Sequence, residues 1–342
     1  MTKRAGCTIV ISTTPATPLH WKRNLVGFFM SESTSHFLKP SLSLDEQIAL
    51  LKNRGLIIEN PQRLRQYLRF IGYYRLSGYF QRSCVGFFQI EGDPLHRFKL
   101  NTTFDQTLRC YIFDRKLRLM IMDAVERIEV AFRTTISNWM SQRYGGHWYL
   151  NNSLFLSNFG HDALIKKIET ETGYQNPGKR NEFCSHYFST YSYPVLPPSW
   201  MVAELLSIGT WSSIYGHLHH SERKPVSDAF ELPSGVLASW MHAITYLRNL
   251  CAHHMRIWNR QFTVKPAIAK KYKIQLQDNH RFYAFAVILS ALLRIIADGS
   301  QWYLRLYDLL QEYDDLPKNK MGFSDNWHQY PFWRIGNERL GC

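Results

Sequence analysis

The sequence predicts an all-α protein, and three observations lead to this fold class. Apolar residues recur every three or four positions in several long segments, as on the buried face of a helix. No long run alternates apolar and polar residues as a half-buried strand does. Large apolar side chains are abundant, with 45% hydrophobic and 15% aromatic residues, so the chain can bury a core. We expect a helical bundle with an N-terminal helical extension and irregular insertions.

The charge balance indicates a polyanionic partner. The 342 residues include 41 Lys and Arg against 27 Asp and Glu, and the excess of +14 is spread along the chain. Such a surface suits nucleic acid better than a membrane, although many basic proteins bind no nucleic acid. No window of about 18 residues is apolar and free of charge, so we expect no membrane span. Six cysteines without regular spacing argue against a disulfide framework or a zinc ribbon and favour a reducing, cytoplasmic setting.

The first helix is expected after a leader. Residues 1–37 are rich in Ser and Thr, contain scattered Pro and show no periodicity, so we interpret them as a disordered leader. Ser43 can then cap a helix, with Glu46 as its capping-box partner and Gly55 as the stop.

A second helical segment begins at Asn60 and Pro61 and mixes arginines with tyrosines. This mixture suits single-stranded RNA, because rings stack on bases and guanidinium groups hold phosphates. Tyrosines packed in the core under arginine stems explain the pattern equally well, so both interpretations stay open. With a short hairpin that turns at 91–94, the segment completes an N-terminal helical RNA-binding region, residues 38–103. The candidate RNA contacts are Arg65, Arg69, Tyr73, Tyr74 and Arg75.

The longest helix is predicted at 104–143, at the start of a second region, residues 104–342. On this helix Glu126, Glu129 and Arg133 follow one another at spacings of three and four, so they share a face. A solvated ladder of ion pairs accounts for that face. The alternative is that Glu126 or Glu129 orients a catalytic Arg or His on a neighbouring helix.

The second half alternates irregular and helical stretches. Gly and Pro clusters make 144–200 a long connection with a few helical turns. The next predicted helix, 199–220, ends in three histidines that invite a zinc site, but no acid or Cys pair lies at ligand spacing, so we predict no metal. A further helix starts near Pro233 and continues through 246–260, and the last covers about 280–310.

The segment 246–260, YLRNLCAHHMRIWNR, is the main functional candidate. It contains no Gly or Pro, and its apolar positions predict an amphipathic helix. At about 100° per residue, one polar stripe forms. The stripe contains Asn249, His253, Arg256 and Arg260, flanked by Arg248 and Asn259. His254 falls with the apolar residues, so we expect it in the core or in a supporting role. A basic face with a histidine and no carboxylate can bind phosphate and move a proton.

Other chemistries lack their usual motifs. The chain has no phosphate-binding loop, no dinucleotide fingerprint, no nucleophile elbow and no carboxylate cluster for two-metal cleavage. At 248–253, RN-x-x-x-H resembles the R-x4-6-H motif of HEPN-domain ribonucleases. Over roughly residues 38–333 the chain also resembles the AbiD/AbiF-like abortive-infection family, with its stretches in the family's order. These stretches are KPSLSLDEQIALLKNRGL, IGYYRLSGY, FDRKLR, DAVERIEVAFRT, LPPSWMVAELLSIGTWS, LRNLCAHHMRIWNR and MGFSDNW.

This resemblance implies a bacterial phage-defence protein with a HEPN-like helical core that cleaves RNA without a metal or other cofactor. Arg248 would hold the scissile phosphate, His253 would act as general acid or base, and Asn249 would position them. The products would carry a 2′,3′-cyclic phosphate or 3′-phosphate and a 5′-OH. Supporting roles fall to His254, Arg256, Asn259, Glu129 and Arg133, and Arg260 joins the RNA contacts.

HEPN sites are usually built from two facing motifs, so the resemblance also implies a homodimer. On an ideal helix Arg248 and His253 lie about 140° apart, which favours the same arrangement. A second match, Arg180-Asn181-x4-His186, lies in a predicted loop where the resemblance covers His186 rather than Arg180, so it is the weaker candidate for a second half. Two functions stay open. One is a ribonuclease regulated by RNA, and the other is a non-catalytic protein that holds a structured small non-coding RNA.

Overall fold

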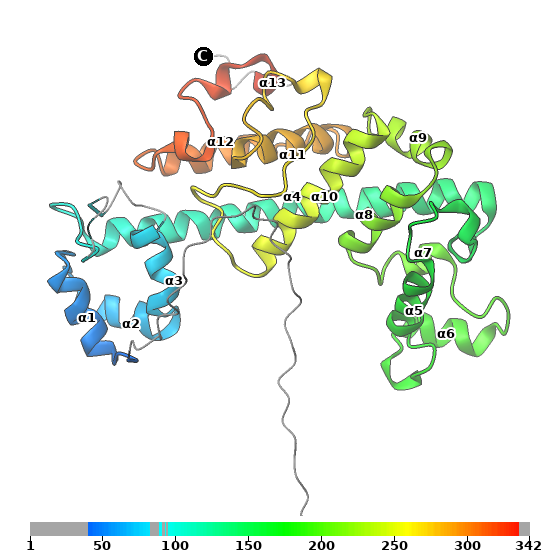
Figure 1. Ribbon diagram of the computed structural model, residues 1–342, viewed down its shortest axis with the longest axis horizontal. Coiled ribbons are helices and arrows are strands. Elements are labelled where there is room, and N and C mark those ends of the chain that lie inside the picture. The colour runs from blue at the N-terminus through cyan, green and yellow to red at the C-terminus, as the bar shows by residue number, and fades with distance from the viewer. Residues whose placement is uncertain (1–39, 83–88, 91–92, 94, 335–342) are drawn as a thin grey trace, which may run out of the picture. The chain divides into compact units, whose positions relative to one another are not determined.

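The computed structural model describes residues 40–82, 89–90, 93 and 95–334. These residues are all-α, as predicted, and the only β-type pairing among them is three isolated bridges. From Leu42 onward they belong to one compact unit. The helices are α1 (Leu44–Asn53), α2 (Pro61–Phe70), α3 (Tyr73–Ser77), α4 (Phe104–Tyr144), α5 (His161–Thr172), α6 (Glu182–Thr190), α7 (Ser199–Val202), α8 (Ile208–His217), α9 (His220–Ala229), α10 (Ser234–Ala252), α11 (Phe282–Ile296), α12 (Trp302–Glu312) and α13 (Pro331–Arg334) (Figure 1).

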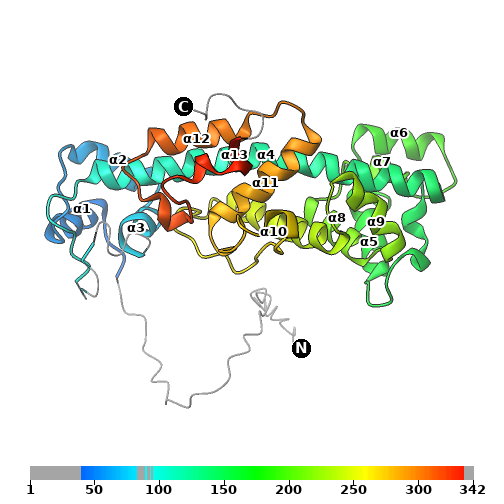
Figure 2. The ribbon, with the colours of Figure 1, turned by 90° about the horizontal axis from the view of Figure 1, so that it is seen from above.

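Helix α4 is the element against which most of the others pack. Its 41 residues extend for about 60 Å. The helix begins at a capping box, in which the Thr103 and Gln106 side chains each accept the other's backbone N–H, and it ends at Gly145 with φ 83°. Helices α7 to α12 and the π-helical turn Gly78–Arg82 all contact it. In Figures 1 and 2 it crosses the picture from α1–α3 at one end to α5–α9 at the other.

The N-terminal helices follow the prediction. Ser43 accepts the Glu46 amide, the Glu46 carboxylate accepts the Ser43 amide, and Gly55 adopts φ 88° just after α1. Asn60 caps α2. The helical spacing then breaks at Gly72, which has φ 90°, so the predicted single segment becomes α2 and α3.

Two predictions concern residues that the structure describes only in part or not at all. The leader, 1–37, lies outside the described residues. Of the predicted hairpin, the structure describes an antiparallel bridge between Gln89 and Phe98, while most of the turn at 91–94 lies outside.

Segment 144–200 contains more helix than predicted. Helix α5 ends at Gly173, which adopts the left-handed conformation, and Asn181 caps α6 by accepting the Cys184 amide at 2.9 Å. The Gly and Asn residues interpreted as parts of a loop are therefore helix boundaries.

Two other predicted helices are each broken. Segment 199–220 forms α7 and α8, with α9 starting at its end, and segment 280–310 forms α11 and α12 on either side of Gly299, which has φ 70°. In both segments apolar residues continue at helical spacing across a short interruption, so periodicity alone does not reveal the break.

Candidate functional site

Helix α10 (Ser234–Ala252) ends earlier than predicted. The amide of His253 still donates to the Asn249 carbonyl at 3.0 Å, so His253 is the last residue held in the helical pattern. His254 adopts the left-handed conformation with φ 55°, and 255–260 continue as irregular turns. The predicted helical stripe is therefore only partly formed.

Two residues of that stripe, and one that was expected to flank it, instead stabilise the turns after α10. Arg260 Nε donates to the Arg256 carbonyl at 2.7 Å, and the Arg256 guanidinium donates to the carbonyl of Trp258. Asn259 Oδ1 accepts Arg281 Nη1 at 3.3 Å. The prediction that these side chains extend a helical face was wrong, because the helix does not reach them.

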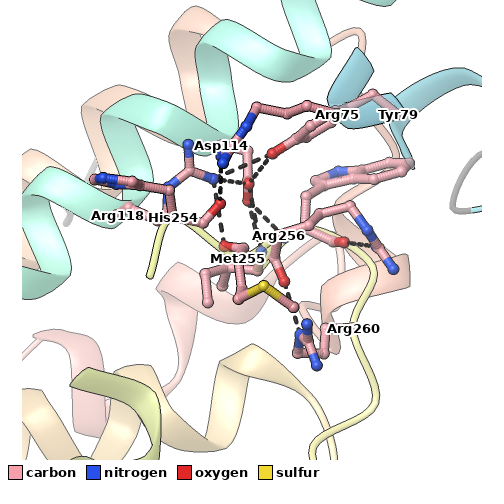
Figure 3. Close-up of polar contacts among 10 residues, drawn as sticks. Arg75, Tyr79, Asp114, Arg118, His254, Met255, Arg256 and Arg260 are labelled. Carbon is pink, nitrogen blue, oxygen red and sulfur yellow. Dashed lines mark hydrogen bonds and ion pairs between the residues drawn. The ribbon is translucent and has the colours of Figure 1, made fainter. Parts of the chain in front are cut away.

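A buried polar cluster holds the turn after α10. On α4, Asp114 is fully buried, and its Oδ1 accepts the amides of Ile257 at 3.0 Å and Trp258 at 2.6 Å. Its Oδ2 accepts the Tyr79 hydroxyl at 2.6 Å and pairs with Arg118. Together with Arg75, these side chains form what we call the clamp: Arg75, Tyr79, Asp114 and Arg118 (Figure 3).

The clamp also donates to carbonyls of the same turn. Arg75 Nη1 donates to the His254 carbonyl at 3.0 Å, and Arg118 Nη1 donates to the Met255 carbonyl at 3.4 Å. His254, predicted for the core or a supporting role, is an exposed residue with its backbone fixed from α3. Arg75 therefore lies beside His254, the residue that follows His253, as Figure 3 shows.

The clamp matches no known sequence motif, but the spacing of two of its residues indicates it. Asp114 and Arg118 stand four residues apart in the stretch FDRKLR, on the face of α4 that is otherwise apolar. A carboxylate on the buried face of a long helix needs partners, and an Arg one turn later is the nearest available.

Burial determines the protonation of the groups around the clamp. Burial and the charge of Asp114 raise the pKa of Tyr79, so the phenol stays protonated and its O–H donates a hydrogen bond to Asp114. Burial also raises the pKa of Asp114, while Arg118, Tyr79 and the two amides oppose that rise. The pKa of the neighbouring Cys251 thiol is raised by burial to about 12, so this thiol carries no charge at neutral pH and is a poor nucleophile.

Arg248 lies in an open cleft along α4, with a volume of about 540 Å³, which we call the α4 cleft. The cleft brings Arg248 together with Glu126, Glu129 and Arg133, the three residues predicted to share a face. Arg133 pairs with Glu204 at 2.7 Å rather than with either glutamate of its own helix, so the predicted ion-pair ladder is not what this face forms. The remaining lining residues are Leu119, Met122, Asp123, Val125 and Val130.

The arginines of the α4 cleft have unused hydrogen-bonding capacity. The Nε atoms of Arg248 and Arg133 are buried and have no partner among the described residues. Arg248 Nη1 donates to Asn249 Oδ1, at 3.4 Å. A buried donor without an acceptor costs roughly 1 to 3 kcal/mol. An anion could accept from these donors, against the repulsion of Asp123, Glu126 and Glu129 in the same lining.

His253 is exposed at the end of α10 and does not line the α4 cleft. Because it keeps its helical position, the separation of about 140° from Arg248 around the axis persists. One chain therefore presents these two side chains in different directions.

The predicted RNA contacts on α2 and α3 fall into two groups. Arg65 pairs with Asp45, and the Tyr73 hydroxyl accepts Arg54 Nη1 at 2.8 Å, so these two side chains stabilise the N-terminal helices. Arg69, Tyr74 and Arg75 are exposed. The structure thus leaves only part of the predicted set available to a ligand.

The second motif match has a structural role. Arg180 Nε and Nη2 donate to the carbonyls of Gly173 at 3.0 Å and Tyr174 at 2.9 Å, and its guanidinium lies over the Phe188 ring at 4.3 Å. His186 is exposed and lies in the middle of α6, after the N-cap residue Asn181. Arg180 closes the end of α5.

Two of the three histidines at 217–220 bond backbone carbonyls. His217 Nδ1 bonds the Ser213 carbonyl at 2.7 Å, and His219 Nε2 bonds the Ser153 carbonyl at 3.1 Å. In the part of the chain that the structure describes, no group of three or more His, Cys, Asp or Glu side chains is arranged to hold a metal ion. No helix in that same part is long and apolar enough to cross a membrane.

Comparison with known proteins gives one match. A family model described as Abi-like protein matches residues 66–259, a range that begins in α2 and ends just after α10, so it includes the clamp, the α4 cleft and the segment 248–253. Neither a curated protein nor a solved structure matches the chain.

Proposed function

The protein belongs to the Abi-like family, since that match covers more than half of the chain, and we propose that it acts in phage defence as a metal-independent HEPN-type endoribonuclease. Family membership supports abortive infection as the setting. The ribonuclease activity is inferred from the end of α10 and the α4 cleft.

The observation that carries the proposal is the buried Arg248 Nε without an acceptor, in a cleft that Arg133 also lines. The Arg248 guanidinium suits a phosphate, because it offers N–H donors and a permanent positive charge. Arg133 pairs with Glu204, and the carboxylates of Asp123, Glu126 and Glu129 also line the cleft, so Arg248 is the group that would bind the anion. Arg248 holds the scissile phosphate and stabilises the charge that develops on it. Asn249, which accepts from Arg248 Nη1, helps to orient that guanidinium.

His253 supplies the acid–base chemistry. The 2′-OH of the substrate loses its proton to a base and attacks the adjacent phosphorus, and the P–O5′ bond breaks as the leaving oxygen receives a proton. An imidazole can perform either transfer, and His253 is exposed, so RNA can reach it. The products are a 2′,3′-cyclic phosphate and a 5′-OH.

The working site is formed by two copies of the chain. Arg248 and His253 point in different directions within one chain, so a single phosphate cannot meet both squarely. In a homodimer, Arg248 of one copy and His253 of the other face the same phosphate.

The test of the chemistry is RNA cleavage in EDTA. Wild-type protein should cut RNA and leave the cyclic-phosphate and 5′-OH ends, whereas Arg248→Ala and His253→Ala should not. Cleavage that persists in both variants, or that requires a divalent metal, would show that the protein is not a metal-independent ribonuclease that uses Arg248 and His253.

The composite site has a sharper test, which is to mix the two inactive variants. A dimer of one Arg248→Ala chain with one His253→Ala chain retains one intact site if each site takes one residue from each chain. About a quarter of wild-type activity should then return after exchange of subunits, because half of the dimers are mixed and each has one of two sites. If the mixture stays inactive while subunit exchange is shown by a fluorescent label, the site lies within one chain.

The second candidate is a non-catalytic protein that holds a small non-coding RNA. It is favoured by the exposed arginine and tyrosine side chains of α2 and α3. Specific RNA binding, together with no cleavage of any RNA by the wild-type protein, would select this function over the nuclease.

A further inference from the structure

The surface of α2 and α3 has an unusual composition. Between Glu59 and Glu91 the chain contains no acidic residue, while it has five arginines in the same interval. Arg63 and Arg65 are paired with aspartates from other segments. Arg69 and Arg75 have no carboxylate partner among the described residues, so their charge is available to an external anion.

Two aromatic side chains on this surface are almost fully in water. Tyr74 is 90% exposed and Phe70 is 74% exposed. Their neighbours differ from them: Tyr67 packs against Phe104 with ring centroids 6.0 Å apart, and Tyr73 is held by a hydrogen bond from Arg54. The exposed rings therefore have no packing role that would explain them.

Charge selects the type of ligand. An exposed aromatic pair alone would suit a protein partner as well as a base. Here the Arg69 guanidinium lies over the Phe70 ring, 5.4 Å from its centroid, in a stretch without acidic residues. Flat rings beside unpaired arginines match a chain of bases and phosphates, in which bases stack on rings and guanidinium groups bind phosphates.

The position of this surface links it to the end of α10. The Cα atoms of Phe70 and Tyr74 are separated by four residues, so they lie at most about 14 Å apart, a span that two or three nucleotides cover. The residue after Tyr74 is Arg75, which donates to the carbonyl of His254 (Figure 3). The segment that carries the two rings is thus hydrogen-bonded to the turn that begins at His253.

We propose that Phe70 and Tyr74, with Arg69, form an aromatic platform on which unpaired bases of single-stranded RNA stack next to His253. This inference rests on the proposed function and specifies its substrate as unpaired RNA. The proposed RNA contacts therefore differ from those expected from the sequence. Phe70 is added, and Tyr73 and Arg65, which bond to other protein residues, are removed.

The test measures binding separately from cleavage. In a His253→Ala background, Phe70→Ala and Tyr74→Ala are titrated with a fluorescent, unstructured RNA of about 12 nucleotides and with the same strand in a duplex. Each substitution should weaken binding of the single strand roughly 5- to 100-fold, as expected for the loss of one stacked base, and should leave the duplex unchanged. Tyr74→Phe should bind as well as its parent, because the ring remains.

The matched control is Tyr193→Ala, which removes a tyrosine that is 84% exposed in the segment after α6. It should not change binding. The platform is wrong if the Phe70 and Tyr74 variants bind the single strand like their parent, if single strand and duplex weaken equally, or if Tyr193→Ala weakens binding as much. The two proposals fail separately. If the Phe70 and Tyr74 variants lose binding but wild-type protein cleaves no RNA, the platform stands and the nuclease is wrong. If the variants bind like their parent while wild-type protein cleaves RNA, the nuclease stands and the platform is wrong.

Discussion

Two segments of the chain, 180–186 and 248–253, match the R-x4-6-H motif, and they differ in their structural surroundings. At 180–186 the arginine donates to two backbone carbonyls and stacks on Phe188, and Asn181 caps α6. At 248–253 the arginine has a buried Nε without a partner, in a cleft with a second arginine. The first arginine uses its Nε and Nη2 donors within the fold, whereas the Nε donor of the second has no acceptor among the described residues.

The difference teaches that the type of helix end decides what such a motif can do. Arg180 and Asn181 precede a helix, where the side chains serve carbonyls and amides that the helix ends leave open. Arg248 and Asn249 lie in the last turn of α10, where Asn249 is already inside the helix and its side chain is not needed as a cap. The motif at a helix C-terminus is therefore the one whose Arg and Asn side chains are not used to close helix ends.

The largest expected effect separates the two arginines directly. Arg248→Ala should lower RNA cleavage about a thousandfold, because it removes the group that stabilises the phosphate charge, whereas Arg180→Ala should leave cleavage within about twofold of wild type. Initial rates on a labelled RNA measure both. Equal losses of cleavage in the two variants would show that Arg248 has no special role in the reaction.

The next effect concerns the clamp, which only the second motif has. Asp114→Asn should lower the free energy of unfolding by about 2 to 3 kcal/mol, because an amide cannot pair with Arg118 as the carboxylate does. Urea denaturation measures this, with the exposed Asp298→Asn as the control that should change little. Should the two variants unfold at the same urea concentration, the turn after α10 does not depend on the clamp.

A smaller effect is expected in the α4 cleft. Arg133→Ala should lower cleavage about tenfold, since it removes the second guanidinium from the cleft while Arg248 remains. Arg115→Ala, an exposed arginine on the same helix outside the cleft, should not change the rate. A loss with Arg115→Ala of the same size would indicate a general effect of charge rather than a role for the cleft.

The smallest effect tests the structural role of the first motif. Arg180→Ala should lower the free energy of unfolding by roughly 1 kcal/mol and the melting temperature by about 2 °C, because the carbonyls at the end of α5 lose their donor. His186→Ala, in an exposed side chain, should change neither stability nor cleavage. Differential scanning calorimetry measures the shift, and a stable Arg180→Ala variant would show that water replaces the lost bonds.

Much of the fold could be predicted because its determinants are local. The capping box at Ser43 and the unbroken apolar spacing of α4 depend only on nearby residues, and the structure confirms both. The end of α10 could not be predicted in this way. No Gly or Pro stops the helix; instead, Asp114 binds the amides of Ile257 and Trp258 from 143 and 144 residues away and turns the chain.

The candidate site shows the same division. The sequence placed Glu126, Glu129 and Arg133 on one face, and the structure brings Arg248 into the same cleft. That one of the two glutamates orients a catalytic side chain stays a prediction. The assignment of His254 to the core failed because it assumed a helix that had already ended. Exposure also could not be read from the mixture of arginine and tyrosine on α2 and α3, since burial depends on which neighbours arrive from other segments.

The clamp also fixes when the site can exist during synthesis of the protein. Asp114 and Arg118 leave the ribosome long before Ile257 and Trp258, so the turn that holds His253 has no anchor until the chain has been made beyond α10. A nascent chain, or one cut before residue 258, therefore has α10 with Arg248 and His253 but lacks the anchor that fixes the turn after them. The contacts between α4 and residues 257–258 are therefore among the last tertiary contacts of this region to form as the chain is made.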